Sequence, residues 1–305
     1  MSTPLLTVVI PVYNRADLVQ ETLQSLERQT LRRFDVVLVD NNSNDGTFEV
    51  LTKWANINRS DDRNVTVLRE PTRGACAARN TGMAAARTPW VMFFDSDDIM
   101  LPNHLADFDA VAQQHPKTDL ITRAVYRREP DGKLRILANC KGGAGALRAQ
   151  IFHSTLATPR FAAKTELVRK AGGWDNRVWG WNDYELGVRL LLRNPSVIDI
   201  GGKPSMIIIP QMQSITGTSF SSSPRKWEDA LDACQRSLEQ CGRGEMVKYI
   251  NCRRVILAAI YAREGAYAEA RRLRKSVPGW RYRAVYWHQR MLRRGAEFTA
   301  RLLLG

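Results

Sequence analysis

Three acidic residues set close together are the feature of this sequence best suited to chemistry. Asp95, Asp97 and Asp98 directly follow an apolar run that ends in Phe93 and Phe94. Carboxylates are hard oxygen ligands, and this number of them suits a divalent cation held jointly with phosphates. Without a cation the three acids would repel one another and raise their own pKa values. The plainer alternative is a solvated turn that caps the next helix.

Two further polar segments follow apolar runs and carry groups that could recognise a nucleotide. Tyr13 and Asn14 offer an aromatic ring that could stack on a nucleobase and an amide that could hydrogen-bond it. Asp40, followed by the amide of Asn42, could accept a hydrogen bond from a base imino proton. Taken alone, each segment is equally consistent with a strand-to-helix turn, in which Asn14 or Asp17 would serve as the helix cap.

The elements that must position these groups alternate between strands and helices. Apolar or β-branched runs predict strands at 7–12, 34–39, 65–68 and 90–94, and helical spacing predicts helices at 17–29, 47–55, 74–86 and 102–114. This alternation predicts an α/β fold with a mostly parallel sheet flanked by helices on both faces. Ligands bind beyond the carboxyl ends of the strands in such sheets, so the polar segments should converge on one edge.

The rest of the chain predicts a less regular half followed by a helical region. The expected elements are a hairpin of 122–127 and 134–137, a glycine-rich loop at 141–146, a helix at 183–193, a strand at 206–209, a polar loop or linker at 216–224 and a helical hairpin of 255–263 and 267–275. We therefore divide the chain into 1–222 and a basic helical C-terminal region at 223–305. Within the first part, 1–105 would be the nucleotide-binding half and 106–222 the acceptor half.

The composition of the 305-residue chain is that of a soluble globular protein, with 44% hydrophobic and 25% charged residues. The net charge of +14 is uneven, because 223–305 holds 18 Lys/Arg against eight Asp/Glu. Such an asymmetry indicates an anionic partner, either a membrane surface or a nucleic acid. No run is long enough to span a bilayer, and no signal-peptide pattern precedes the first strand. The five cysteines show no CxxC pairing, so reduced cytosolic thiols are the simplest interpretation.

Four sequence blocks, taken together, resemble glycosyltransferase family 2. They are Pro-Val-Tyr-Asn-Arg at 11–15, Val-Asp-Asn-Asn-Ser-Asn-Asp-Gly-Thr at 39–47, Gly-Ala-Cys-Ala-Ala-Arg-Asn-Thr-Gly at 74–82 and Asp-Ser-Asp-Asp at 95–98. Their order and spacing match across about 7–105, and a weaker match continues to about 215. The resemblance implies a GT-A fold with a Rossmann-like, mostly parallel sheet. It also implies a nucleotide-diphosphate sugar donor, a Mn²⁺ or Mg²⁺ ion and inversion at the anomeric carbon.

The resemblance also implies roles for individual residues. The nucleotide-sugar-binding residues would be Pro11, Tyr13, Arg15, Asp40, Asn42, Arg79, Asn80, Asp95 and Ser96. Asp97 would be the principal metal ligand, and Asp95 would contact the ion or the ribose. Asp98 would support these two acids without contacting the ion. In the family, an acid in an acidic pair that opens a later helix is the catalytic base. Here the corresponding stretch is Trp-Asn-Asp-Tyr-Glu at 181–185, so we assign the base to Asp183.

The sequence departs from the family pattern at two places. Asn182 stands where an acid is frequent, so only Asp183 carries charge there. The stretch Gln-Met-Gln-Ser at 211–214 lacks the histidine often found after the last strand, which leaves the third metal ligand unassigned. No Gln-x-x-Arg-Trp block follows, and with the lack of membrane helices this argues against a processive polysaccharide synthase.

The expected function is therefore metal-dependent, inverting transfer of a sugar, with a UDP-sugar favoured, to a hydroxyl of a saccharide acceptor. We expect a lipid-linked acceptor in bacterial surface polysaccharide assembly and a peripheral position on the cytosolic face of the plasma membrane. The support for that location is the segment 271–305, which holds ten Lys/Arg, one acid and several aromatic residues.

Two alternatives stay open at this point. A sugar-nucleotide nucleotidyltransferase would usually show a glycine-rich loop with Arg and Lys after the first strand, where this chain has Tyr13-Asn14-Arg15. A nucleic-acid-binding protein would use the basic C-terminal region but would leave the carboxylate cluster unexplained. Neither the dinucleotide fingerprint nor a GxxxxGK[ST] phosphate loop is present, which disfavours dehydrogenases and ATPases.

Overall fold

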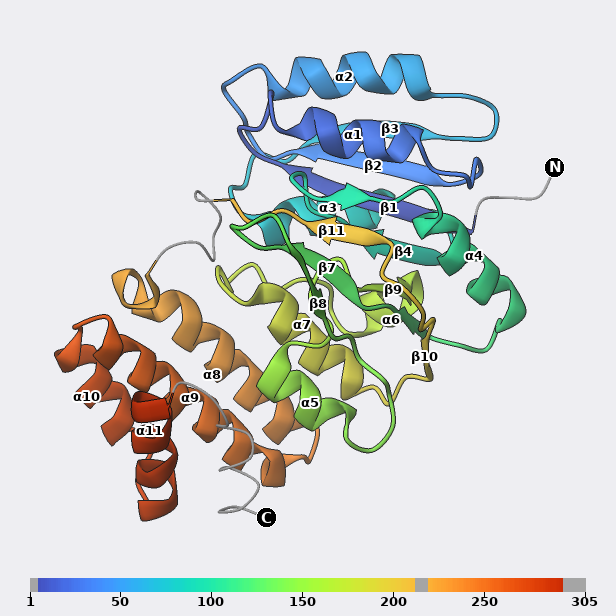
Figure 1. Ribbon diagram of the computed structural model, residues 1–305. Helices are drawn as coiled ribbons and strands as arrows, with labels where there is room; N and C mark the ends of the chain where they lie inside the picture. Colours follow the sequence, from blue (N-terminus) through green and yellow to red (C-terminus); the bar gives the residue numbers. More distant parts are fainter. Residues whose placement is uncertain (1–4, 212–218, 293–305) are drawn as a thin grey trace.

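The computed structural model describes residues 5–211 and 219–292, arranged around a central sheet with helices on both faces (Figure 1). The seven strands of this sheet lie in the order β10-β6-β9-β4-β1-β2-β3. Their bounds are β1 Leu6–Val12, β2 Asp35–Asp40, β3 Val65–Arg69, β4 Trp90–Phe93, β6 Leu120–Thr122, β9 Phe161–Lys164 and β10 Val197–Asp199. All of them run in one direction except β9, which pairs antiparallel with both β4 and β6.

Alternate residues of the buried strands face opposite helical layers, as a period of two requires. Val8 and Ile10 of β1 belong to the apolar cluster shared with α1, α2 and α4, whereas Val9 belongs to the cluster that contains α3 and α7. The bounds of these helices are α1 Val19–Glu27, α2 Thr47–Asn58, α3 Ala75–Ala85, α4 His104–Gln114 and α7 Asn182–Leu191. Both faces of the parallel strands are therefore covered, and their carboxyl ends remain as the place for a site.

A second, four-stranded sheet in the order β5-β11-β7-β8 lies next to the acidic residues that follow β4. Its strands are β5 Ile99–Met100, β7 Val125–Arg128, β8 Leu134–Leu137 and β11 Met206–Ile208. The predicted hairpin is present as the antiparallel pair β7 and β8. Because β5 begins directly after Asp98 and pairs with β11, this small sheet fixes the exit of the chain from the carboxylate cluster.

The C-terminal region is helical and shares its apolar core with the rest of the protein. Its helices are α8 Pro224–Gln240, α9 Val247–Arg263, α10 Tyr267–Lys275 and α11 Trp280–Leu292, with short 3₁₀ turns at Phe220–Ser222 and Gly244–Met246. One buried cluster runs from α3 through α5 (Ala146–His153) and α7 into α8–α11. In Figure 1 these orange to red helices lie at the opposite end of the molecule from α1 and α2. Within the described residues, no helix has both the length and the apolar character needed to cross a bilayer.

The α/β class, the mostly parallel sheet and the C-terminal helical extension are confirmed. Two local regions differ from the prediction. The strand expected at 122–127 is divided between β6 and β7, which lie in different sheets. Much of the stretch after the glycine-rich loop forms α5, and the antiparallel β9 and the short helix α6 (Thr165–Lys170) were not predicted. The expected loop or linker at 216–224 lies partly outside the described residues, and the tail beyond Leu292 lies wholly outside them.

Candidate active site

The strand register places the predicted polar segments at one edge of the central sheet. Val12 of β1 lies opposite Asp40 of β2, and the Asn41 amide donates to the Val12 carbonyl at 2.8 Å. Val9 lies opposite Phe93 of β4, so the acids that follow Phe93 emerge beside the residues that follow Val12. The convergence expected from a parallel sheet is therefore present in the structure.

The segment after β1 and the segment after β2 are bonded to each other. The Asn14 side chain accepts from the Asn44 amide at 3.0 Å, and the Arg15 amide donates to Thr47 Oγ1 at 2.9 Å. Asn14 and Asn42 take left-handed conformations, with φ of 47° and 61°, which Asn tolerates better than most residues. The two turns therefore form one rigid rim, on which Pro11 and Arg15 are half-buried and Asn42 is exposed.

Asp40 is the buried polar group of this rim and lacks a full set of partners. Its side chain accepts from the Ser43 amide at 3.4 Å through Oδ2, which also lies 3.9 Å from Arg69 Nε. Its other oxygen, Oδ1, is buried and has no hydrogen-bond partner among the described residues. A buried acceptor without a partner is costly, so this oxygen is suited to a donor group on a ligand.

Tyr13 lies at the exposed edge of the same rim. Its ring is 40% exposed, and the Arg73 guanidinium lies over it at 4.7 Å and donates to its hydroxyl. An exposed aromatic ring at the end of a buried strand offers a stacking surface for a planar ligand. The structure therefore brings Tyr13 and Asp40 to one edge and adds Arg73, which was not among the predicted site residues.

The three acids after β4 have different surroundings. Asp95 is half-buried and forms an ion pair with Arg79, with 2.7 Å between Oδ1 and Nη2. Burial and then the charge of Asp95 raise the pKa of Asp97 to about 6, although Arg15 and Arg79 oppose the rise. Asp98 is buried, accepts from the Ile209 amide at 3.0 Å and has a raised pKa for the same two reasons. Asp98 thus anchors the residue that follows β11.

The donor set fits a cation that is shared with a phosphate. Within the described residues, no group of three or more His, Cys, Asp or Glu side chains is placed to hold an ion. Mg²⁺ is commonly bound through one or two carboxylates, with substrate phosphates and water completing its shell. Asp97 and Asp95, next to the buried Ser96, provide such a pair. Burial and, after it, the charge of Asp95 raise the pKa of Asp97, and a cation between the two acids would offset the second of these effects. The stretch 212–214, where a third ligand was sought, lies outside the described residues.

Arg79 connects the carboxylates with the start of α7. It is buried on α3, and besides its ion pair with Asp95 it donates to Asn182 Oδ1 at 3.4 Å. Its guanidinium also lies 4.4 Å from the centre of the Trp174 ring. Asn80, the next residue, donates to the Trp174 carbonyl and accepts from the Trp174 amide, both at 2.8 Å. The Asn80 amide was expected to face the nucleotide, but its bonds are made to the protein, and it holds Trp174 instead.

Asp183, the predicted base, lies in the first turn of α7. Its carboxylate accepts from the Tyr184 amide at 2.7 Å and from the Thr158 amide at 3.3 Å. Burial raises the pKa of Asp183 above its ordinary value, while the charge of Arg79 opposes the rise. A carboxylate held in place with an elevated pKa is what general-base catalysis near neutral pH requires.

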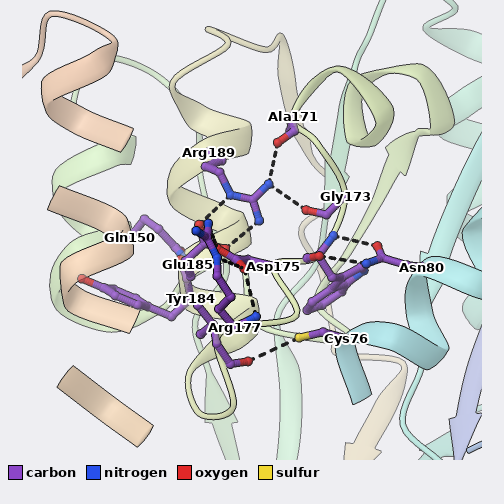
Figure 2. A network of polar contacts seen from close by, with 12 residues as sticks. Cys76, Asn80, Gln150, Ala171, Gly173, Asp175, Arg177, Tyr184, Glu185 and Arg189 are labelled. Carbon is purple, nitrogen blue, oxygen red and sulfur yellow. Dashed lines mark hydrogen bonds and ion pairs between the residues drawn. The ribbon is translucent and has the colours of Figure 1, made fainter. Parts of the chain in front are cut away.

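Several supporting residues escaped the sequence analysis. Figure 2 shows Glu185 and Arg189 of α7 paired with each other, with Arg189 also reaching the carbonyls of Ala171 and Gly173. The spacing of four residues on a predicted helix was the signal that could have indicated this pair. Asn41 had no such signal, yet its side chain accepts from the Gly74 amide at 2.8 Å and so fixes the start of α3.

Comparison with known proteins gives a consistent picture. The profile described as "Glycosyl transferase family 2" matches residues 7–158. An uncharacterized glycosyltransferase of Haemophilus influenzae is 27% identical over 204 residues, which span 61% of this chain and 62% of that protein. The succinoglycan biosynthesis protein ExoW of Rhizobium meliloti is 36% identical over 103 residues, which span 33% of this chain and 31% of that one. The similarity to these relatives thus covers less than two thirds of their length.

Solved structures share the fold at low sequence identity. TarS of S. aureus in complex with UDP-GlcNAc is 18% identical, with a TM-score of 0.62 over 89% of this chain and 90% of that one. The mannosyltransferase PcManGT of Pyrobaculum calidifontis, in complex with GDP-Man and Mn²⁺, is 19% identical, with a TM-score of 0.53 over 99% of this chain and 87% of that one. These neighbours support the GT-A architecture, including its helical C-terminal part.

Proposed function

Because the chain belongs to glycosyltransferase family 2, we propose that it transfers a sugar from a nucleotide-diphosphate sugar to a hydroxyl of a saccharide acceptor. The observation that supports this proposal is that the unpaired Asp40 oxygen and the acids after β4 lie at one sheet edge, while Arg79 joins Asp95 to Asn182, the neighbour of Asp183. We favour a UDP-sugar, since TarS, which shares the fold, binds UDP and UDP-GlcNAc. Saccharide acceptors are supported by the role of the ExoW relative in succinoglycan biosynthesis.

In the proposed mechanism one group of residues binds the donor and another activates the acceptor. Asp40 and Tyr13 bind the base, and Asp183 removes the proton from the acceptor hydroxyl as its oxygen attacks the anomeric carbon. The bond to the diphosphate breaks on the opposite side of that carbon, so the configuration inverts. Asp97 and Asp95 would hold a Mn²⁺ or Mg²⁺ ion, which supplies charge stabilisation to the departing diphosphate. Arg79 donates to both Asp95 and Asn182 and so holds the two side chains at a fixed distance from each other.

We extend the proposal to a lipid-linked acceptor and a peripheral position on the cytosolic face of a membrane. Its support is a surface on α11 that combines the exposed rings of Trp280 and Trp287 with the exposed cations Arg281 and Arg283. Aromatic rings and cations together favour the interface of an anionic bilayer.

The division into 1–105, 106–222 and 223–305 is likewise part of the proposal, with the donor bound by the first part and the acceptor by the second.

The experiment that tests the function is a donor screen. The protein is incubated with UDP-, GDP- and dTDP-sugars in Mn²⁺ or Mg²⁺, and release of the nucleoside diphosphate is measured. We expect one nucleotide class to be hydrolysed slowly without an acceptor, and this hydrolysis to be lost in Asp40→Asn and in excess chelator. Release of pyrophosphate from a nucleoside triphosphate and a sugar phosphate would instead identify a nucleotidyltransferase. No binding or turnover of any nucleotide sugar would reject the proposal.

A further inference from the structure

A buried ion pair within α7 is bonded to the loop that precedes this helix (Figure 2). Arg189 donates to both oxygens of Glu185, each at 2.6 Å, and its remaining amino group donates to the carbonyl oxygens of Gly173, at 2.7 Å, and Ala171. The Glu185 side chain is only 2% exposed and that of Arg189 17%. A buried ion pair contributes little net stability compared with an apolar pair of the same shape. Stability alone therefore does not explain why Arg189 is bonded to Glu185 and to two loop carbonyls.

The loop at 171–175 has little freedom to take a different path. Gly172 and Gly173 adopt left-handed conformations, with φ of 87° and 65°, and a Cβ atom on Gly173 would lie 2.7 Å from Asn80 Oδ1. The next residue, Trp174, is bonded through both its amide and its carbonyl to the Asn80 side chain. The loop is thus held from α7 on one side and from α3 on the other.

The ring of Trp174 contacts β4, which leads into the carboxylate cluster, and Arg79 of α3, which is paired with Asp95. It meets the Phe93 ring edge to face, with 5.0 Å between the ring centres and 85° between their planes. Phe93 ends β4, two residues before Asp95. On the other side, the Arg79 guanidinium lies 4.4 Å from the centre of the Trp174 ring, a distance suited to a cation–π contact. The position of Trp174 therefore limits where Arg79 can lie.

These contacts connect α7, through the loop at 171–175 and Arg79, back to the start of α7. Arg79 donates to Asp95 and to Asn182, the first residue of α7, while Arg189, two turns further along α7, holds the loop that carries Trp174. We propose that Arg189 is a positioning residue for the active site: through the Gly173 carbonyl it seats Trp174 against Arg79 and so fixes the start of α7, with Asp183, relative to Asp95. This inference rests on the proposed function only where turnover is concerned, because the placement of Trp174 is a property of the fold.

Arg189→Lys tests the proposal, since lysine keeps the charge but cannot bond to Glu185 and both carbonyls in one plane. The chain offers a matched control in Arg254→Lys. Arg254 on α9 is likewise largely buried, with 11% of its side chain exposed, and bonds to Asp232, Gln235 and Asn251, none of which lies in the loop at 171–175. Both variants lose a buried, multiply bonded guanidinium, so both should lower the melting temperature by similar amounts.

The first measurement does not depend on any substrate. The protein is labelled with 5-fluorotryptophan, and the ¹⁹F resonance of Trp174 is assigned from Trp174→Phe. We expect this resonance to shift or broaden in Arg189→Lys and to stay unchanged in Arg254→Lys. An unchanged resonance in Arg189→Lys, or an equal change in both variants, overturns the proposal.

The second measurement compares binding with turnover of the donor found in the screen. In Arg189→Lys we expect kcat to fall by roughly 10–100-fold, because small misplacements of catalytic groups carry penalties of that size, while the Kd for UDP stays within about threefold. Arg254→Lys should keep both values. Loss of UDP affinity in parallel with kcat would show a general loss of structure and overturn the positioning role.

Failure of the proposed function and failure of the positioning role give different results. If the wild-type protein turns over no donor, the proposed function fails, while the ¹⁹F measurement still decides whether Arg189 seats Trp174. If Arg189→Lys does not fold, Glu185→Gln replaces it, because glutamine keeps the size of the side chain and one acceptor for Arg189. Glu185→Gln should then move the Trp174 resonance in the same way, and an unmoved resonance counts against the proposal.

Discussion

At the scale of single residues, the site depends on how two acids of the same type are made to differ. Asp95 is neutralised by Arg79 at 2.7 Å, whereas Asp183 is bonded to two backbone amides and its pKa is raised by burial. A carboxylate that is held in place and has a raised pKa is suited to accept a proton near neutral pH. We therefore keep, as a proposal, charge binding for the cluster after β4 and base catalysis for Asp183 of α7.

The first prediction concerns Asp183→Asn, which keeps the size of the side chain but removes its basicity. We expect kcat for transfer to fall by about 10²–10⁴-fold, the usual span for loss of a general base. The wild-type kcat should fall as the pH drops through the Asp183 pKa, which lies above 3.8, because the protonated acid cannot accept a proton. Kinetic profiles of both proteins check this. Persistence of the same acidic limb in Asp183→Asn would place the base elsewhere.

The second prediction concerns the metal. Asp97→Asn should abolish the gain in UDP affinity that Mn²⁺ provides, a loss of about tenfold or more, or about 1.4 kcal/mol, in a titration with and without the ion. Asp109→Asn on α4 is the matched control, since Asp109 is also half-buried but bonds only to Gln113 among the described residues. Equal Mn²⁺ dependence in wild type and Asp97→Asn would remove Asp97 from the metal site.

The sequence was informative about these residues because the groups lie next to buried strands. Asp40 and Asp97 could be predicted from position alone, since a parallel sheet gathers its carboxyl ends. The partner of each side chain could not be predicted in this way. Asn80 was assigned to the nucleotide, yet it bonds to Trp174, which is 94 residues away. A contact of that sequence separation leaves no periodic signal, and only the fold reveals it.

At the scale of elements, α3 packs closely against β1. A Cβ atom on Gly82 would lie 2.3 Å from Val9 Cγ1 and 3.2 Å from Val39 Cγ2. The alanine-rich face of α3 and this glycine let the helix lie against the sheet. Because Arg79 is three residues before Gly82 on the same helix, the closeness of this packing also sets the position of Arg79.

The third prediction is therefore that Gly82→Ala destabilises the protein, although alanine is normally the better residue in a helix. Overpacking against a stiff β-branched side chain should cost roughly 1–3 kcal/mol in the free energy of unfolding. Gly244→Ala is the control, because a Cβ there meets nothing within 4 Å. Urea denaturation of both variants decides the matter, and a Gly82→Ala protein as stable as wild type would show that α3 can move away at no cost.

Element prediction succeeded where periodicity was strong and failed where pairing partners were distant. The strands and helices before residue 115 were predicted from their apolar periods, except the two-residue strand β5, which is too short to show one. The antiparallel strand β9 is only four residues long, Phe-Ala-Ala-Lys, and shows little that identifies a strand. It is ordered by its neighbours β4 and β6, so its place in the centre of the sheet follows from tertiary contacts.

At the scale of the whole molecule, the C-terminal helices contact the segment just before α7 directly. Trp181, which precedes α7, packs against Phe220 and Trp227, with ring centres 5.8 and 5.4 Å away. Arg253 of α9 lies 4.8 Å from the centre of the same ring. The C-terminal region therefore packs against the residues just before Asp183. A movement of these helices would be transmitted to the start of α7 through these contacts.

The outer surface of α11 is the part of this region that we expect to meet a membrane. Trp280 and Trp287 are 64% and 49% exposed, and Arg281 and Arg283 are exposed beside them. Val285, by contrast, is buried against the core, so α11 has an inner face and a cationic, aromatic outer face. Cations near an anionic bilayer contribute about 1 kcal/mol each, and indole rings settle at the interface.

The last prediction is that this surface binds anionic vesicles. Full-length protein should sediment with vesicles of equal parts phosphatidylcholine and phosphatidylglycerol, and much less with phosphatidylcholine alone. Arg281→Gln with Arg283→Gln should weaken binding by about 10–30-fold, and high salt should release the wild type because the attraction is screened. Trp280→Ala with Trp287→Ala should weaken binding at any salt concentration. Ile57→Ala, at a side chain that is 71% exposed on α2, is the control and should bind as wild type does. If all these proteins stay in the supernatant at low salt, the outer face of α11 is a solvated helical surface and the peripheral location must be abandoned.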